Sequence, residues 1–307
     1  MGPAARILVL HHGYPGQFAA LLPRLQARGH QLTALLPANP VQQQRSKDLG
    51  IPFHCYGLKR GNGSDSHPWS VETETKILRG EAAAQVAEQL HHLGYRPDLI
   101  LGHPGWGELL FLDRIWPAAP QLHYVEFCYD QPGTDLDFND PLQPVASWRD
   151  HARAKMKNAN VFLNLERMAA GLTPTPFQHS LIPAWGQRKT SVIHDGIDTA
   201  WLRPDATAQV RLGDRLTLRA GDPVVTFVNR TFEPYRGIHV FLRALALAQR
   251  AHPQLQAVLV GQDSPKVSYG AHRSDGQGWL SALKQELGDE LDWSRIHPVG
   301  KVSHQQL

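Results

Sequence analysis

Short apolar runs alternate with helical patterns along most of the chain. Residues 6–10 and 31–36 are predicted to form buried strands, and residues 17–28 between them have the spacing of a helix. A long helix is predicted over residues 72–93 and a short strand over residues 98–101. Repeated strand–helix units with short apolar strands indicate an α/β fold in which helices cover both faces of a parallel sheet.

Two such series of elements flank the stretch over residues 191–198. At 307 residues the chain is long for a single core. We therefore predict two domains, over residues 1–188 and residues 189–307. The second series contains about half of the strands and helices expected in a complete α/β domain, which typically contains ~100–150 residues.

The clearest candidate for binding chemistry is a strand, loop and helix over residues 223–251. An apolar strand leads to Arg230, the loop carries Arg236 and Gly237, and apolar residues then recur at helical spacing. In an open parallel sheet, ligands bind beyond the carboxyl ends of the strands, where a helix N-terminus offers backbone N–H groups to an anion. We predict that both arginines hold a phosphate and that the glycine lets the backbone approach it. The alternative is a surface loop with solvated arginines.

A second candidate is the glycine-containing turn over residues 12–18. Gly13 and Gly16 allow a tight turn, and a helix from Gln17 would direct its N–H groups toward the strand ends, where a donor phosphate would bind. The G-x-G-x-x-G pattern of a dinucleotide site does not occur here. An ordinary turn between strand and helix is the competing interpretation.

Polar and aromatic residues follow two further predicted strands. His103 precedes a Gly-Trp-Gly turn, so its imidazole is predicted to face a ligand, although a structural histidine is the alternative in a chain with 17 histidines. Trp106 in that turn is the tryptophan best placed to contact a ligand. After the strand predicted over residues 122–127, Glu126 and Asp130 are candidates to accept hydrogen bonds from ligand hydroxyls, with structural roles as alternatives. The same loop carries two further acidic candidates, Asp135 and Asp137.

The charge and composition of the chain argue against several classes of partner and cofactor. The net charge of +3 comes from interspersed residues, so a nucleic-acid stripe is not expected. Cys55 and Cys128 lack metal-ligand spacing and are too few for a disulfide framework. The paired histidines at 11–12 and 91–92 are not accompanied by further ligands, so no metal is predicted. No apolar run approaches the ~20 residues of a membrane span. We expect a cytoplasmic protein without a cofactor and with at most peripheral membrane contact.

Together these motifs make the chain resemble a family 4 (group 1) glycosyltransferase of the GT-B architecture. The resemblance covers almost the whole chain and rests on residues 12–18, 103–108, 124–129, 191–198, 228–230 and 233–237. It implies two Rossmann-like domains that face each other across a cleft. It also implies that Arg230 and Arg236 hold the diphosphate of a sugar nucleotide and that His103 reaches the donor sugar. On the same resemblance, Trp106 would contact a sugar face, and Glu126 and Asp130 would accept hydrogen bonds from acceptor hydroxyls. The family more often has lysine at the second arginine position, and a guanidinium preserves the charge with a different geometry.

The resemblance implies transfer of a hexose from a nucleotide diphosphate sugar to a hydroxyl of a glycan or glycolipid, in polysaccharide or cell-envelope biosynthesis. Retention of the anomeric configuration is implied too. Arginines and helix amides would stabilise the leaving diphosphate without a metal. No carboxylate nucleophile is nominated, so front-face attack is the default hypothesis. The alternatives are a sugar-nucleotide epimerase of the same fold and a non-catalytic fragment that binds a glycan or a partner protein.

The family pattern also bears on the end of the sequence. Beyond residues 296–300 the family continues into a segment with an E-x7-E carboxylate motif, which grips the ribose and orients the donor sugar. This sequence ends at Leu307. We therefore expect an incomplete second domain, weak donor affinity and negligible transfer.

Overall fold

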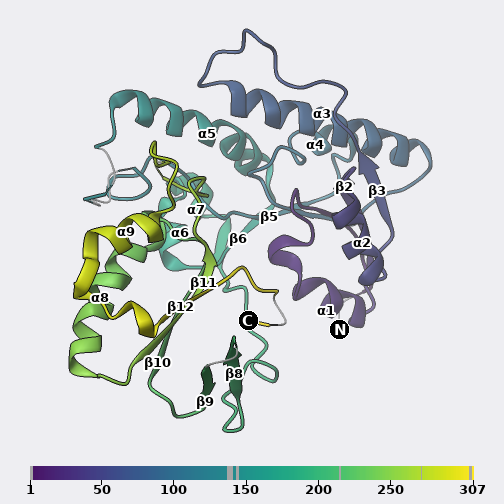
Figure 1. Ribbon diagram of the computed structural model, residues 1–307. Helices are drawn as coiled ribbons and strands as arrows, with labels where there is room; N and C mark the ends of the chain where they lie inside the picture. The colour runs from purple at the N-terminus through teal and green to yellow at the C-terminus, as the bar shows by residue number, and fades with distance from the viewer. Residues whose placement is uncertain (1–2, 137–140, 143–144, 214–215, 271, 304–305) are drawn as a thin grey trace. The chain divides into compact units, whose positions relative to one another are not determined.

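The computed structural model describes residues 3–136, 141–142, 145–213, 216–270, 272–303 and 306–307. Contacts divide the chain into two units (Figure 1). The first comprises Met1–Phe138 and Ala146–Ile197, and the second comprises Asn139–Val145 and Asp198–Leu307. The division lies later than the predicted boundary after residue 188, because the strand Thr190–Val192 pairs in the sheet of the first unit.

The first unit contains a seven-stranded sheet in the order β3-β2-β1-β4-β5-β6-β7, and every pair is parallel. Its strands are β1 (Arg6–Leu10), β2 (Gln31–Pro37), β3 (Phe53–Tyr56), β4 (Leu99–Gly102), β5 (Gln121–Tyr124), β6 (Ala170–Thr173) and β7 (Thr190–Val192). Its helices are η1 (Gly16–Phe18), α1 (Leu21–Ala27), α2 (Pro40–Asp48), α3 (Val71–His92), α4 (Leu112–Ile115), α5 (Trp148–Arg167), α6 (Pro176–Leu181) and α7 (Ala184–Gln187). The predicted parallel sheet is confirmed for this unit.

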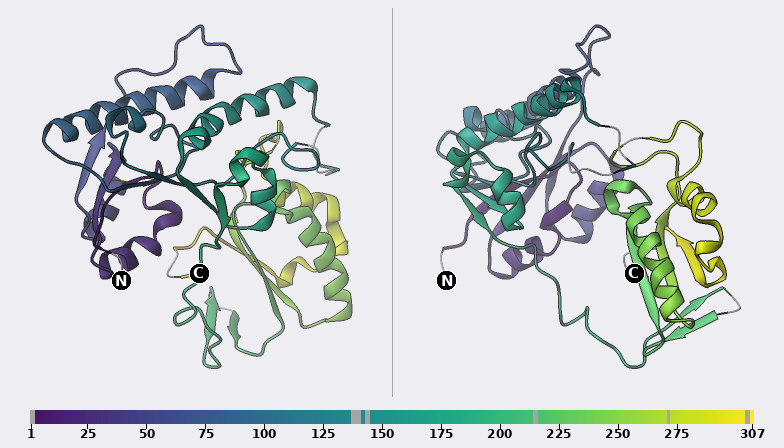
Figure 2. Two further views of the ribbon diagram at one scale, coloured as in Figure 1. Left: turned by 180° about the vertical axis from the view of Figure 1, so that it is seen from behind. Right: turned by 90° about the vertical axis from the view of Figure 1, so that its left-hand side faces the viewer.

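Helices cover both faces of this sheet, as Figure 2 shows. Successive residues of a strand point to opposite faces. On β1, Leu8 and Leu10 belong to the core that includes residues of α3 and α4. Ile7 and Val9 belong to the core on the other face, with residues of η1 and α1. Both faces of β1 are therefore buried, which explains its unbroken apolar sequence.

Two predicted elements of the first unit differ in their bounds. The helix predicted over residues 17–28 is divided into η1 and α1, because the amides of Phe18 and Ala19 make short-range bonds to Pro15 and Gly16. The strand predicted over residues 122–127 ends at Tyr124 in β5, where its pairing with β6 ends. Glu126 consequently lies beyond the strand.

The second unit contains a three-stranded parallel sheet in the order β10-β11-β12 and a separate antiparallel pair, β8 with β9. The strands are β8 (Gln209–Leu212), β9 (Leu216–Arg219), β10 (Val224–Thr231), β11 (Gln256–Gln262) and β12 (Ile296–Gly300). The helices are η2 (Pro234–Arg236), α8 (Ile238–Ala251), α9 (Trp279–Leu287), η3 (Gly288–Glu290) and η4 (Trp293–Arg295). Residues of α8, α9 and the sheet share one core. The strand, loop and helix predicted over residues 223–251 are confirmed.

Candidate functional site

The candidate site residues of the first unit follow its central strands. The strand order reverses between β1 and β4, which makes the edge beyond their carboxyl ends the switch point where α/β sheets bind ligands. His11 follows β1, His103 follows β4, and Glu126 follows β5. The rings of His11 and His103 lie 5.4 Å apart. The topology therefore brings together residues that are distant in the sequence.

His11 organises the turn after β1. Its Nδ1 accepts a hydrogen bond from the Gly13 amide at 3.0 Å, so its Nε2 carries the proton that it donates to Gln17 Oε1 at 2.6 Å. Burial lowers the pKa of His11 to about 4, with a smaller contribution from His103. A Cβ on Gly16 would lie 2.2 Å from the His11 ring. The glycine is thus required by the close approach of the imidazole.

Gly13 and Gly16 also line a pocket of about 430 Å³. Arg45 of α2 lies on its border and donates to the carbonyl oxygen of Tyr14 at 3.2 Å. The lining also includes the carboxylate of Asp48 and apolar side chains, so the pocket carries one cation and one anion. The predicted contact of these glycines with a donor phosphate stays a prediction.

His103 repeats the arrangement of His11. Its Nδ1 accepts from the Gly105 amide at 3.0 Å, and its Nε2 donates to Glu126 Oε2 at 3.0 Å. The histidine side chain is 6% exposed and the carboxylate side chain is 44% exposed. The bond from His103 lowers the pKa of Glu126 and outweighs the effect of burial. The result is an ionised carboxylate that a buried imidazole holds at the sheet edge.

A third histidine has the same local pattern. The Nδ1 of His194, which follows β7, accepts from the Gly196 amide at 3.1 Å. Asp195 between them accepts from the Tyr124 hydroxyl at 2.9 Å. Burial and this carboxylate raise the pKa of the Tyr124 hydroxyl. Three His-x-Gly sequences therefore each begin a loop at the carboxyl edge of the sheet.

Trp106 forms an accessible aromatic surface beside these histidines. Its side chain is 38% exposed, and its ring lies 5.5 Å from that of His12 and 5.9 Å from that of His103. Behind it, the buried carboxylate of Glu108 accepts from the Tyr56 hydroxyl at 2.6 Å. Burial raises the pKa of Glu108, but the contacts with His12 and Tyr56 outweigh it and lower that pKa. The predicted sugar-facing surface of Trp106 is accessible.

Buried asparagines of α5 hold the neighbouring loops. Asn160 and Asn164 both donate to the carbonyl oxygen of Pro104. Asn158 pairs with the backbone of Tyr129, accepting from its amide and donating to its carbonyl oxygen, each at 2.8 Å. One helix therefore fixes the loops that carry His103 and Glu126, a role that the sequence pattern did not reveal.

Asp130 occupies a special position in the loop after β5. Its φ angle is +65°, and its carboxylate lies 2.7 Å from His151 Nδ1 of α5. Its amide donates to Asp135 at 2.9 Å. These contacts hold the loop together, and a contact of Asp130 with an acceptor stays a prediction. Asp137 lies outside the described residues.

In the second unit, Arg230 lies at a bulge near the end of β10. Val228 pairs with Val260 and Thr231 pairs with Gln262, so β10 has one extra residue here. Such a bulge redirects side chains. Arg230 is exposed and makes no ion pair or hydrogen bond through its side chain to the residues that the structure describes. Its guanidinium is therefore available to a ligand.

Arg236 is held by its neighbours. Its Nε lies 3.6 Å from Glu233 Oε1, and its guanidinium carbon lies 5.1 Å from the centre of the Tyr269 ring. Glu233 is fully buried, and its Oε2 accepts from the Thr231 hydroxyl at 2.9 Å and from the Ser268 amide at 2.7 Å. Glu233 belongs to the motif over residues 233–237, but the sequence predicted no role for it, and Tyr269 was not singled out.

Helix α8 begins directly after this turn. Gly237 is its N-cap with a φ angle of +76°, and a Cβ there would meet no atom within 4 Å. Glycine is favoured by the left-handed backbone conformation rather than by crowding. The helix has no side-chain cap and no acidic residue in its first turn. Its free amides and positive dipole end therefore add to the charge of Arg230 and Arg236.

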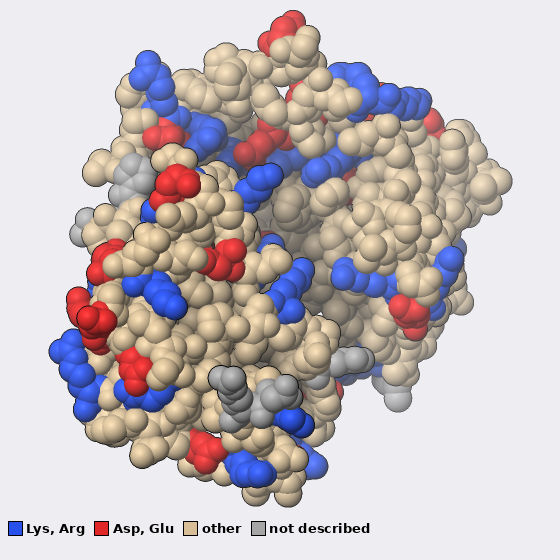
Figure 3. Space-filling model, in the orientation of Figure 1, with Lys and Arg blue, Asp and Glu red and all other residues tan. Residues whose placement is uncertain are grey.

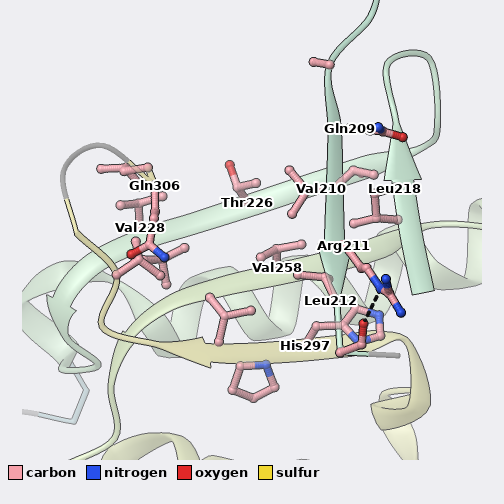
Figure 4. A pocket seen from close by; sticks show the side chains of 18 of the residues that line it. Gln209, Val210, Arg211, Leu212, Leu218, Thr226, Val228, Val258, His297 and Gln306 are labelled. Carbon is pink, nitrogen blue, oxygen red and sulfur yellow. Dashed lines mark hydrogen bonds between the residues drawn. The ribbon is translucent and has the colours of Figure 1, made fainter. Parts of the chain in front are cut away.

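The second unit also contains an apolar groove of about 940 Å³ (Figure 4). Val228, Thr226 and Val258 line one side, and Val210 and Leu218 of the β8–β9 pair line another. Neither Arg230 nor Arg236 lines it. The groove is thus separate from the arginine turn in its lining and its chemistry.

Within the described ranges, no three His, Cys, Asp or Glu side chains are grouped so that they could hold a metal ion. None of the helices over the described residues is both long enough and apolar enough to span a bilayer.

Comparison with known proteins supports the sequence interpretation. The family model "Glycosyl transferase family 4 group" matches residues 28–202, more than half of the chain. HepE from Anabaena in complex with UDP and glucose is 16% identical with a TM-score of 0.59, over 97% of this chain and 70% of that chain. The catalytic domain of starch synthase IV from Arabidopsis thaliana, bound to ADP and acarbose, is 14% identical with a TM-score of 0.58, over 99% and 75%. These likenesses confirm the α/β fold class of GT-B type. A search of curated proteins found no match.

Proposed function

Because the chain belongs to the glycosyl transferase family 4 group, we propose that it transfers a hexose from a nucleotide diphosphate sugar to a hydroxyl of a glycan or glycolipid, with retention of the anomeric configuration. The predicted enzyme class, a glycosyltransferase, follows from this membership. HepE is in complex with UDP-glucose, and starch synthase IV is bound to ADP. Nucleotide diphosphate donors are therefore the first substrates to test.

The arginine turn of the second unit carries the proposal. Three features lie within residues 230–238: an exposed guanidinium with no partner among the described residues, a second one held by a buried carboxylate, and a helix N-terminus without a side-chain cap. All three favour an anion at the same end of β10. A diphosphate has enough oxygens to bind both guanidiniums and the helix amides.

The same groups would assist the reaction. When the bond from the anomeric carbon to the diphosphate breaks, negative charge increases on the leaving phosphate oxygen. Arg230, Arg236 and the amides of α8 are already oriented, so they stabilise that charge without reorganisation. The proposal requires neither a metal nor a resident cofactor for this step.

The edge of the first unit would receive the acceptor. Glu126 is ionised and accessible, so it can accept a hydrogen bond from an acceptor hydroxyl. His103 positions that carboxylate through its Nε2 proton rather than offering a free nitrogen to the donor sugar. Trp106 provides an exposed ring for a sugar face.

A product assay tests this function. The 307-residue protein would be incubated with labelled UDP-, ADP- and GDP-hexoses and a panel of glycan and glycolipid acceptors. The proposed function predicts release of nucleotide diphosphate with transfer of label to an acceptor, and the anomeric coupling constant of the product should match that of the donor. Substantial turnover would overturn the expectation of negligible transfer that the E-x7-E pattern of the family implies. An epimerised nucleotide sugar formed without acceptor would contradict transfer, and inverted product would contradict retention. Glu126→Gln should reduce turnover, while Glu88→Gln, at an exposed glutamate of α3, serves as its matched control.

A further inference from the structure

The first unit has an exposed apolar patch where α3 and α5 run side by side (Figures 1 and 2). We define it by Trp69, Ile77, Trp148 and Met156 and call it the α3–α5 patch. Trp148 is 63% exposed, Ile77 is 46% exposed and Met156 is 37% exposed. Side chains of this size are normally buried, so their exposure together requires an explanation.

Two contacts join α5 to α3 and to the residues just before α3 along the patch. The rings of Trp69 and Trp148 are 5.7 Å apart in an edge-to-face arrangement. The hydroxyl of Thr73 lies 3.5 Å from the carbonyl oxygen of Met156. Ile77 lies one turn after Thr73 on α3, so the two share a helix face. The apolar surface therefore crosses the seam between the helices.

Basic residues surround this surface. Arg149, Arg153 and Lys155 are exposed on α5, and the guanidinium carbon of Arg149 lies 4.7 Å from the centre of the Trp148 ring. Figure 3 shows basic side chains, with acidic ones among them, over the part of the molecule where α3 and α5 lie. Residues 59–79 and 148–157 contain eight lysines and arginines and four acidic residues. The patch is thus apolar at its centre and cationic at its margin.

The acidic residues nearby do not cancel this charge. Asp150 caps α5 through Ser147 and lies 3.7 Å from Arg153. Glu72 lies 3.8 Å from the Lys76 ammonium and 3.6 Å from that of Lys157. Arg149 and Lys155 have no acidic partner among the described residues. An excess of positive charge therefore remains beside the tryptophans.

We propose that the α3–α5 patch attaches the protein peripherally to a lipid bilayer with anionic headgroups. Tryptophan is stable at the boundary between headgroups and acyl chains, because its ring is apolar and its N–H is polar. Basic side chains at the margin are attracted to anionic lipids, and their aliphatic stems also cover apolar surface. A helix seam with this composition lies on a membrane surface and does not cross it.

The position of the patch agrees with the proposed acceptor edge. Helix α5 follows β5, so its N-terminus lies at the carboxyl end of the sheet. His151 in its first turns contacts Asp130, four residues after Glu126. Attachment here would place the carboxyl edge of the first unit near the bilayer. The further consequence, that the acceptor is lipid-linked, rests on the proposed function, whereas membrane attachment does not.

Vesicle co-sedimentation tests the proposal. The 307-residue protein would be mixed with vesicles of phosphatidylcholine alone and of phosphatidylcholine with 30% phosphatidylglycerol. We expect binding to the anionic vesicles that weakens with added salt. The double variant Arg149→Gln/Arg153→Gln should lose about 25-fold in partition coefficient, since each basic side chain contributes about fivefold. Trp148→Ala should lose about tenfold, because apolar burial in the interface is lost.

Matched controls separate the patch from general effects. Trp185→Ala removes a tryptophan on α7 that is 40% exposed, and Arg24→Gln/Arg28→Gln removes two exposed arginines around α1. Both should bind vesicles like the unaltered protein. No binding to anionic vesicles, equal binding to both lipid compositions, or equal losses in the controls would overturn the proposal. Titration of the same samples with UDP measures the proposed donor site separately. A failure of membrane attachment can therefore be distinguished from a failure of the proposed glycosyltransferase function.

Discussion

Arg230 and Arg236 differ in their surroundings, so their removal should have unequal effects on phosphate binding. Arg230 is exposed and has no ionic partner among the described residues. Arg236 shares its charge with Glu233 at 3.6 Å and packs over Tyr269. Part of the charge of Arg236 is therefore neutralised before a ligand binds. We predict that Arg230→Ala weakens nucleoside diphosphate binding more than Arg236→Ala does.

The magnitude follows from the kind of contact. A hydrogen bond to a charged group contributes about 1.5–3 kcal/mol, which corresponds to roughly 10- to 150-fold in the dissociation constant. For Arg230 we expect a loss in the upper part of that range. For Arg236 we expect a loss in the lower part of that range, because the phosphate has to compete with the Glu233 carboxylate for the Arg236 guanidinium. Arg236→Lys should lose less than Arg236→Ala, since part of the interaction is charge alone.

Isothermal titration of each variant with UDP and with uridine measures these effects. The two arginines are expected to affect UDP and to leave uridine unchanged. Equal losses for UDP and uridine in Arg230→Ala would refute the reasoning, because the arginine would then act on the base, the ribose or the fold. Thermal unfolding of each variant shows whether the second unit is intact.

Three further predictions concern stability and accessibility. Burial lowers the pKa of His11 from 6.5 to about 4, so between these values the unfolded chain binds a proton that the folded chain does not. The contribution of His11 should therefore be nil above pH 6.5 and should lower stability by about 3 kcal/mol toward pH 4, in addition to the loss from His123, whose pKa burial lowers to about 3. Denaturant unfolding at both pH values checks this, and a decrease of equal size in His11→Gln would contradict it. Gly16→Ala should lower the free energy of unfolding by about 2–4 kcal/mol, because the new Cβ would clash with the His11 ring. Gly29 also has a positive φ angle but has open space around it, so Gly29→Ala should lower that free energy by about 1 kcal/mol. Equal melting temperatures of the two variants would exclude the clash. Limited proteolysis should cut first within residues 198–208, where every residue is exposed, and initial cleavage inside residues 95–130 would contradict the division into units.

Much of the fold could be predicted from local patterns. Strand β1 and helices α3 and α8 have clear periodicity, and their observed bounds lie within two residues of the predicted ones. Helix α5 was not predicted, because its buried face carries asparagines instead of a continuous apolar stripe. Those asparagines bind loop backbone, and a hydrophobicity pattern does not register such contacts.

The candidate site was predicted only in part. Arg230, Arg236 and Gly237 could be found because a strand, a turn and a helix place them within a few residues. Glu233 and Tyr269 were missed, because their roles depend on the loop around Ser268 packing against the turn. The contact between His103 and Glu126 could not be predicted from the sequence either, because it joins residues that follow two different strands.

The central claim is that the arginine turn binds the diphosphate of a nucleotide sugar. The most direct measurement is calorimetric titration of the unaltered protein with UDP, ADP and GDP, each beside its nucleoside, with inorganic pyrophosphate as competitor. The account predicts that at least one diphosphate binds about 100-fold or more tightly than its nucleoside. It also predicts displacement of that diphosphate by pyrophosphate and weaker binding as salt is added. Equal affinities for diphosphate and nucleoside, or no displacement by pyrophosphate, would contradict it.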